Sequence, residues 1–152
     1  MNRPTTHLVN IQQRWSSSDY PPVPVIESEF AVAEACLSWR FPGTYRNAVL
    51  EVGLPRLTTD LWEAIDEADA NLAHLGDFFT PTEAVERTQA WTKLGMPEDL
   101  IAFAADSGGN LFAFSRIGGD AVWLFHHEFG SVDQLAPSFE VWLASYCSLA
   151  KG

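Results

Sequence analysis

The sequence predicts an α+β fold, in which helices at both ends of one domain enclose an antiparallel sheet. Apolar residues recur at helical spacing up to about residue 95, change to short apolar runs between residues 100 and 127, and return to helical spacing after residue 138. The length of 152 residues suits one domain. Hydrophobic residues make up 47% of the chain, including six Trp and ten Phe, so a sizeable core is available.

The chain begins with a segment that differs from the rest in composition. Three apolar residues are spaced as on one face of a short helix, namely Leu8, Ile11 and Trp15. Three serines follow, and the proline-rich residues 21–24 predict a stiff, extended connector. We therefore expect residues 1–24 to form an N-terminal arm with its connector, and residues 25–152 to form a single domain. The sequence is compatible both with an arm packed through Trp15 and with a free arm.

Two helices are expected at the start of the domain. Ser28 is suited to cap the first one, because its side chain can accept a hydrogen bond from a free backbone N–H. Its apolar side would carry Phe30, Ala33 and Leu37. The second helix is expected over residues 41–52, with Gly53 as a plausible stop.

Two further helices are expected before residue 100, where the apolar residues change from helical spacing to short runs. Helical periodicity over residues 60–75 predicts a helix with one apolar stripe, formed by Leu61, Ile65, Ala68 and Leu72. The next helix has a strong start signal, because Thr80 can cap it, Pro81 suits its first position and Glu83 completes a capping box. It should end near Gly95.

The second half of the domain is expected to hold the sheet and a closing helix. Apolar runs over residues 100–105, 111–115 and 121–125 are separated by glycine-rich turns, which predicts an antiparallel meander within residues 100–127. The closing helix is amphipathic, with Phe139, Trp142, Leu143 and Tyr146 on one side.

The charge distribution is the main functional signal. The formal net charge of −11 would repel phosphate backbones, so nucleic-acid binding is disfavoured, and it would attract a basic partner. Residues 60–86 contain eight acidic residues and no Lys or Arg. We therefore predict that a basic protein binds here, with the candidate contact residues Asp60, Trp62, Glu63, Asp66, Glu67, Asp69 and Asp77. Solubility is the alternative explanation for the charge.

Trp62 is the candidate aromatic anchor of this surface, because it lies beside the apolar stripe and tryptophan is common among residues that dominate binding energies. A place in the second layer of the core is the alternative for Trp62.

The sequence contains no recognisable catalytic constellation, so we expect a protein that is not an enzyme and needs no cofactor. His126 and His127 are adjacent and would point to opposite faces of a strand, so they do not suit one metal ion. Cys36 and Cys147 are expected to be reduced, and Cys36 is expected to pack in the core. Nucleophile-elbow and phosphate-loop motifs are absent.

The start of the chain has no secretory signal, and the longest apolar run is too short to span a bilayer. We therefore expect a cytoplasmic protein without membrane contact, present as a monomer or weak homodimer.

Several segments, taken in order, resemble the SUKH superfamily, the Smi/Knr type. Residues 41–46 (FPGTYR) resemble its helix start, residues 96–106 with Gly109 and Asn110 resemble its strand–turn–strand signature, and residues 126–128 (HHE) resemble the end of its next strand. Residues 138–143 (SFEVWL) are similar to its closing helix. The chain departs from the family at residues 51–53 (EVG), and the strands expected before the capping-box helix are hard to see.

This resemblance implies a SUKH-like binding domain. Fungal members regulate cell-wall assembly as interaction scaffolds, and bacterial members are mostly immunity proteins that neutralise toxins, many of them nucleases. The resemblance therefore implies that the chain is an immunity protein whose carboxylates bind a basic toxin domain. A regulatory or scaffold protein without a toxin partner is the alternative. The family has no shared catalytic residues.

Overall fold

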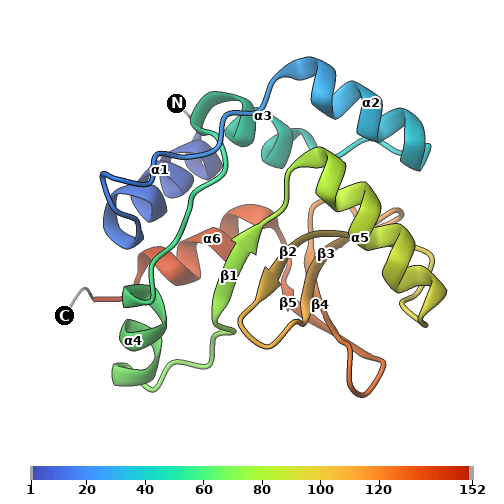
Figure 1. Cartoon of the computed structure of the whole chain (residues 1–152). Helices are drawn as coiled ribbons and strands as arrows, with labels where there is room; N and C mark the ends of the chain where they lie inside the picture. The colour runs from blue at the N-terminus through green and yellow to red at the C-terminus, as the bar shows by residue number, and fades with distance from the viewer. Residues whose placement is uncertain (1, 151–152) are drawn as a thin grey trace.

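The computed structural model describes residues 2–150, which form six helices and a five-stranded sheet (Figure 1). The helices are α1 (Arg3–Trp15), α2 (Glu27–Leu37), α3 (Gly43–Val52), α4 (Asp60–Glu67), α5 (Pro81–Lys93) and α6 (Phe139–Cys147). The strands are β1 (Leu75–Phe78), β2 (Leu100–Asp106), β3 (Leu111–Ser115), β4 (Val122–His126) and β5 (Ser131–Ala136). The predicted α+β class is confirmed.

The sheet is a continuous antiparallel meander in the order β1-β2-β3-β4-β5. The three predicted strands are present as β2, β3 and β4. The flanking strands β1 and β5 were not expected, because β1 has only four residues and most of β5 is exposed, so neither carries a run of apolar residues.

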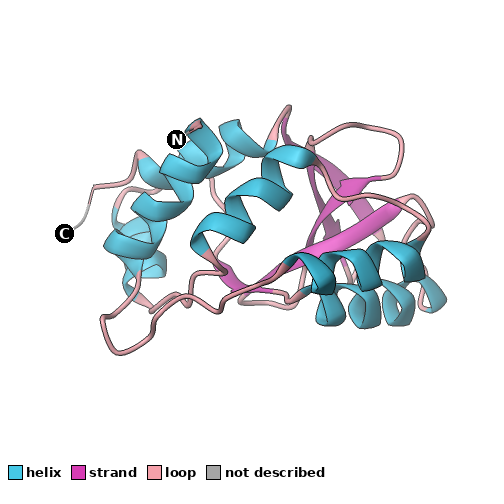
Figure 2. Cartoon of the chain, turned by 90° about the horizontal axis from the view of Figure 1, so that it is seen from above, coloured by secondary structure: helices cyan, strands magenta, loops and turns pink. Residues whose placement is uncertain are grey.

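Helices cover both faces of the sheet (Figure 2). On one face, α6 packs with its Trp142 ring 5.0 Å from the ring of Phe112 and 5.4 Å from that of Phe103. On the other face, α5 packs against β2. The register of β2 shifts between Ala102 and Ala104, and the backbone N–H of Ala102 donates to the Thr88 hydroxyl of α5. This bond satisfies a buried backbone donor at the bulge.

The closing helix α6 completes an aromatic core. Its Phe139, Trp142, Leu143 and Tyr146 are all buried, as predicted. The rings of Phe103 and Phe114 stack at 4.3 Å in the sheet, and Tyr45 of α3 contacts both. Burial of these large rings supplies much of the hydrophobic stabilisation of the fold.

Helix α1 packs against α3 and α6. Its predicted apolar face is fully buried, with exposures of 1% for Leu8, 0% for Ile11 and 1% for Trp15. Arg14 donates hydrogen bonds to the carbonyl oxygens of Cys147 and Leu149, where α6 ends. These carbonyls have no partner within the helix, so Arg14 both satisfies them and places a cation at the negative end of α6. The arm is therefore packed on the domain.

The helix predicted over residues 60–75 ends at Glu67, so that prediction was wrong in its second half. Asp69 adopts φ of 49°, its N–H donates to Asp66, and the N–H of Ala70 donates to Ile65. This is a Schellman ending with aspartate in the left-handed position that glycine usually occupies. Leu72 lies in the following loop.

Two smaller expectations also fail. Helix α2 is preceded by Ile26 at its cap position, and Ser28 lies inside the helix without capping it. Cys36 is exposed on α2, not packed in the core, because Phe30, Ala33 and Leu37 form the buried side and Cys36 lies on the other side.

Candidate functional site

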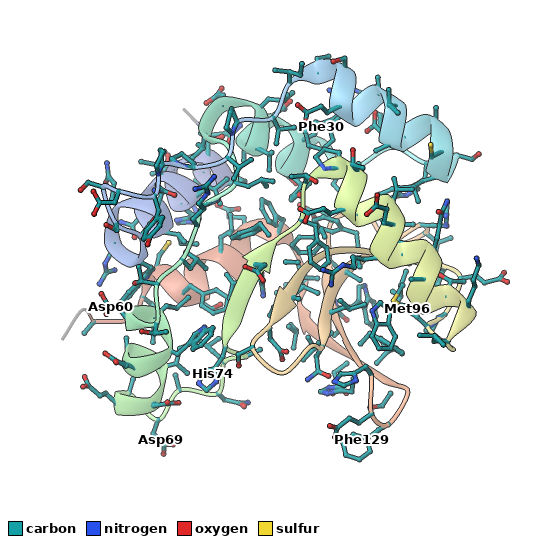
Figure 3. All side chains as sticks on the ribbon, in the orientation of Figure 1. Phe30, Asp60, Asp69, His74, Met96 and Phe129 are labelled. Atoms are coloured by element: carbon teal, nitrogen blue, oxygen red, sulfur yellow. The ribbon has the colours of Figure 1, made fainter. Side chains whose placement is uncertain are left out.

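Helix α4 presents a row of carboxylates to solvent. Leu61, Ala64 and Ile65 are buried and Trp62 is half-buried, whereas the acidic positions of this short helix face outward. We call the exposed residues Asp60, Glu63, Asp66, Glu67 and Asp69 the acidic helix surface. Figure 3 shows Asp60 and Asp69 at opposite ends of this segment, at the edge of the molecule. The structure therefore brings together five of the seven predicted contact residues.

The acidic residues at the end of α4 interact unfavourably with the helix dipole. Acidic residues near the start of a helix interact well with its dipole, whereas acidic residues at its end are repelled. Asp66, Glu67 and Asp69 all lie at the end of α4. The helix dipole therefore does not explain these residues, of which Asp66 contacts His74 and Asp69 occupies the left-handed position at the helix end.

Two side-chain contacts hold α4 against the start of β1. The indole Nε1 of Trp62 donates to the carbonyl oxygen of Leu75 at 2.8 Å. Nε2 of His74 lies 2.8 Å from Oδ1 of Asp66, and the rings of His74 and Trp62 are 6.2 Å apart. Trp62 is half-buried against the core, so only part of its ring is available to a partner.

Asp77 lies apart from the acidic helix surface. It is exposed on β1 and pairs in a backbone bridge with Arg56. Both residues line a pocket of about 440 Å³ that also includes Glu83 and Arg87. The two guanidinium groups offset the two carboxylates, so this pocket has mixed charge and does not extend the acidic helix surface.

A larger pocket, of about 860 Å³, lies between α2, α5 and the turn after β3. Cys36, Lys93, Asp99 and Arg116 are among its lining residues. Arg116 donates to the carbonyl oxygens of Leu37 and Glu98, and Asp99 accepts from the Ser115 hydroxyl. No histidine is among the described lining residues, so no imidazole lies in this pocket to activate the thiol of Cys36.

The predicted separation of His126 and His127 is observed. Nε2 of His126 lies 2.8 Å from Oδ2 of Asp133, whereas Nε2 of His127 lies 2.9 Å from the carbonyl oxygen of Gly108. Within residues 2–150, no group of three or more His, Cys, Asp or Glu side chains could hold a metal ion.

Several shifted pKa values have structural causes. Burial raises the pKa of Tyr45 and Tyr146 far above the usual range, and it raises the pKa of Cys147 to about 11. Hydrogen bonding to Glu27 raises the pKa of Arg46, whose side chain also contacts Glu34. The two tyrosines and Cys147 are therefore held in the neutral form, which suits burial, and Arg46 is held in the charged form, which suits its ion pairs.

The arrangement of the sheet and its covering helices agrees with a comparison with protein families. A model of the SMI1 / KNR4 family (SUKH-1) matches residues 24–145. The chain belongs to this family. A search of curated protein sequences finds no significant match.

The SUKH-1 motifs occupy defined places in the structure. Residues 41–46 lead into α3, and Ser138 caps α6 by accepting a hydrogen bond from the N–H of Val141. Strand β1 is present in the region where the family's strands were hard to see in the sequence. Helix α1 lies before the matched region and still contributes to the core.

SUKH-1 membership limits the functional alternatives. The family includes immunity proteins, its members are known to bind toxin partners, and it is generally non-catalytic. Across the described residues, no helix has both the length and the apolar character needed to cross a bilayer.

The exposed apolar residues outside the acidic helix surface were not predicted from the sequence. These residues include Tyr20, Ile26, Val32, Leu94, Ile117, Phe129, Leu135 and Val141. Most lie in turns or on outward helix positions, where periodicity gives no signal.

Proposed function

We propose that this SUKH-1 chain is a non-catalytic immunity protein that binds a basic toxin domain and neutralises it. The acidic helix surface is the observation that carries the proposal. The proposal places the chain in the cytoplasm, as a monomer or weak homodimer that acts on the toxin before the toxin reaches its target.

Electrostatics explains how such a surface would work. Residues 57–86 contain no Lys or Arg, so no lysine or arginine from this part of the chain neutralises the five carboxylates, and His74 contacts Asp66. A focused negative surface speeds the encounter with a basic protein by about 10- to 1,000-fold at low salt. A toxin that acts on nucleic acid must present cations to phosphate, and carboxylates would occupy the same cations.

Co-purification with the product of each neighbouring gene, followed by mass spectrometry, tests the partner. Recovery of a toxin domain supports the proposal, whereas recovery of only a regulatory protein supports the scaffold alternative and overturns the toxin assignment.

Association kinetics then test the surface. Glu63, Asp66, Glu67 and Asp69 are replaced together by Lys, and association with the recovered partner is measured at several salt concentrations. The matched control replaces Asp19, Glu51, Glu86 and Glu98, which are exposed elsewhere, with the same change in net charge. We expect the first variant to associate more slowly by at least about tenfold and to lose its salt dependence. Equal effects of both variants would show that net charge, not this surface, drives association.

A further inference from the structure

Strand β5 forms an open edge of the sheet. It pairs with β4 on one side, and within the described residues no strand pairs with its other side. Ser131, Asp133, Gln134 and Leu135 are exposed along it. An open edge presents backbone N–H and C=O groups that an extended segment of another protein can bind.

A pocket lies where the end of β5 meets α6. Its volume is about 110 Å³. Leu135 and Ala136 of β5, Val141 and Trp142 of α6, and residues 71–73 are among its lining. An apolar cavity of about 150 Å³ takes up benzene, so this smaller pocket suits one medium-sized aliphatic side chain.

The rim of the pocket is apolar and exposed. Leu135 is 40% exposed and Val141 is 48% exposed. Val141 is on the surface of a helix whose next two residues, Trp142 and Leu143, are buried. Covering this rim would remove apolar surface from water, which is favourable.

The indole of Trp142 adds a polar feature to the pocket. Trp142 is 2% exposed, and its buried Nε1 makes no hydrogen bond within the structure. The Tyr146 hydroxyl donates to the carbonyl oxygen of Ala73, which leaves its oxygen free to accept from this N–H. The pocket therefore requires no acceptor from a ligand, and an apolar side chain suits it.

The charges around the pocket select the occupant. No charged residue is among the pocket's described lining, and no Lys or Arg occurs in residues 57–86 or 117–150, the segments that supply this lining. Asp69 lies two residues before the lining residues 71–73, and Asp133 lies on β5, where it contacts His126 at 2.8 Å. Arg3 and Arg14 reach α6 from α1, but they contact Glu140 and the carbonyls of Cys147 and Leu149, which do not line the pocket. Two copies of this chain, each with a formal net charge of −11, would repel one another, so self-association is disfavoured.

We propose that the groove between β5 and α6 binds an extended, basic segment of a protein partner. The segment adds a strand to β5 and inserts one aliphatic side chain between Leu135 and Val141, with Lys or Arg on both sides of it. This inference rests on the proposed function, because it assigns the groove to the same partner. Residues 71–73 begin two positions after Asp69, so one partner can cover both the groove and the acidic helix surface.

The test uses a panel of labelled seven-residue peptides, each with a central Val, Leu, Ile, Met or Phe between pairs of Arg. Binding to the full chain is measured by fluorescence polarisation, and hydrogen exchange of the β5 amides is followed with and without peptide. Val141→Arg is the test variant. Val32→Arg is its control, because Val32 is an exposed valine on α2, outside the groove.

We expect at least one peptide to bind and to slow exchange in β5. Val141→Arg should weaken that binding by about tenfold or more, and Val32→Arg by less than about twofold. The inference is overturned if no peptide binds, if both variants bind equally well, or if Val141→Arg only abolishes dimers of the chain. If the peptides do not bind but a toxin co-purifies with the chain, this inference fails and the proposed function stands. If the peptides bind in the groove but no toxin co-purifies, the proposed function fails and this inference stands.

Discussion

The indole Nε1 of Trp62 donates a hydrogen bond of 2.8 Å to the carbonyl oxygen of Leu75, which fastens the acidic helix α4 to the first strand of the sheet. Leu75 is fully buried, whereas Trp62 is half-buried. The bond therefore satisfies a carbonyl in a partly dry environment and fixes the orientation of α4. A partner that binds the carboxylates of α4 would meet a helix that is already held in place.

Replacement of Trp62 by Phe should remove this hydrogen bond and keep most of the buried ring. We expect a loss of about 1–2 kcal/mol in the free energy of unfolding, because the Leu75 carbonyl loses its donor. Urea denaturation measures the loss. Trp39→Phe is the control, because Trp39 is also half-buried against the core but its indole makes no hydrogen bond in the described structure. Equal losses in both variants would show that the bond contributes nothing beyond ring size.

Replacement of Asp69 by Gly should stabilise the protein. Asp69 adopts φ of 49°, which costs L-residues energy and glycine little, and its charge is repelled by the end of α4. We expect a gain of about 0.5–1 kcal/mol in the free energy of unfolding. Ala68→Gly is the control and should destabilise, because Ala68 has an ordinary helical φ of −78°.

Asp69→Asn separates the two causes, because it removes the charge and keeps a side chain that tolerates the left-handed conformation. A gain in Asp69→Gly that is fully reproduced by Asp69→Asn would assign the effect to charge alone. No gain in either variant would contradict the prediction.

The two cysteines should differ sharply in reactivity. Cys36 is exposed, whereas Cys147 is half-buried and burial raises its pKa to about 11. At pH 8 only about a thousandth of Cys147 is therefore thiolate, the reactive form. A thiol reagent should label one cysteine rapidly in the native protein and both in urea. Cys36→Ser should abolish the rapid phase, and a rapid phase that survives this substitution would contradict the assignment.

The sequence predicts the helices and central strands of this fold well where one signal dominates. The capping box at Thr80 and Glu83 forms as predicted, because three adjacent residues specify it locally. The prediction of the closing helix α6 is correct because the apolar side of this helix is unbroken. The ending of α4 was missed because an aspartate, not a glycine, adopts the left-handed position, while the apolar period continues by chance to Leu72.

The candidate site is less accessible to sequence reasoning. A run of acids without cations is visible in the sequence, and five of its members gather on α4 and the residue beyond its cap. Asp77 is separated from them because β1, a strand that the sequence did not predict, carries it towards Arg56 and Arg87. The pocket between Leu135 and Val141 depends on how β5 and α6 approach residues 71–73, which no local pattern encodes.

The ion pair between Arg46 and Glu27 should make stability depend on pH. Arg46 is buried, and its hydrogen bond to Glu27 lowers the pKa of that carboxyl below its usual value of 4.5. A lowered carboxyl pKa contributes stability that is present above the unfolded value and is lost as pH falls through the folded value. Glu27→Gln should therefore lower Tm at neutral pH, and the difference from the unmodified protein should shrink below about pH 4.5. Thermal denaturation from about pH 7 to about pH 3 measures this difference. Glu29→Gln is the control on the same helix, because Glu29 makes no ion pair within the described residues. A Tm difference for Glu27→Gln that is the same at every pH would show that the pair stabilises through packing and not through charge.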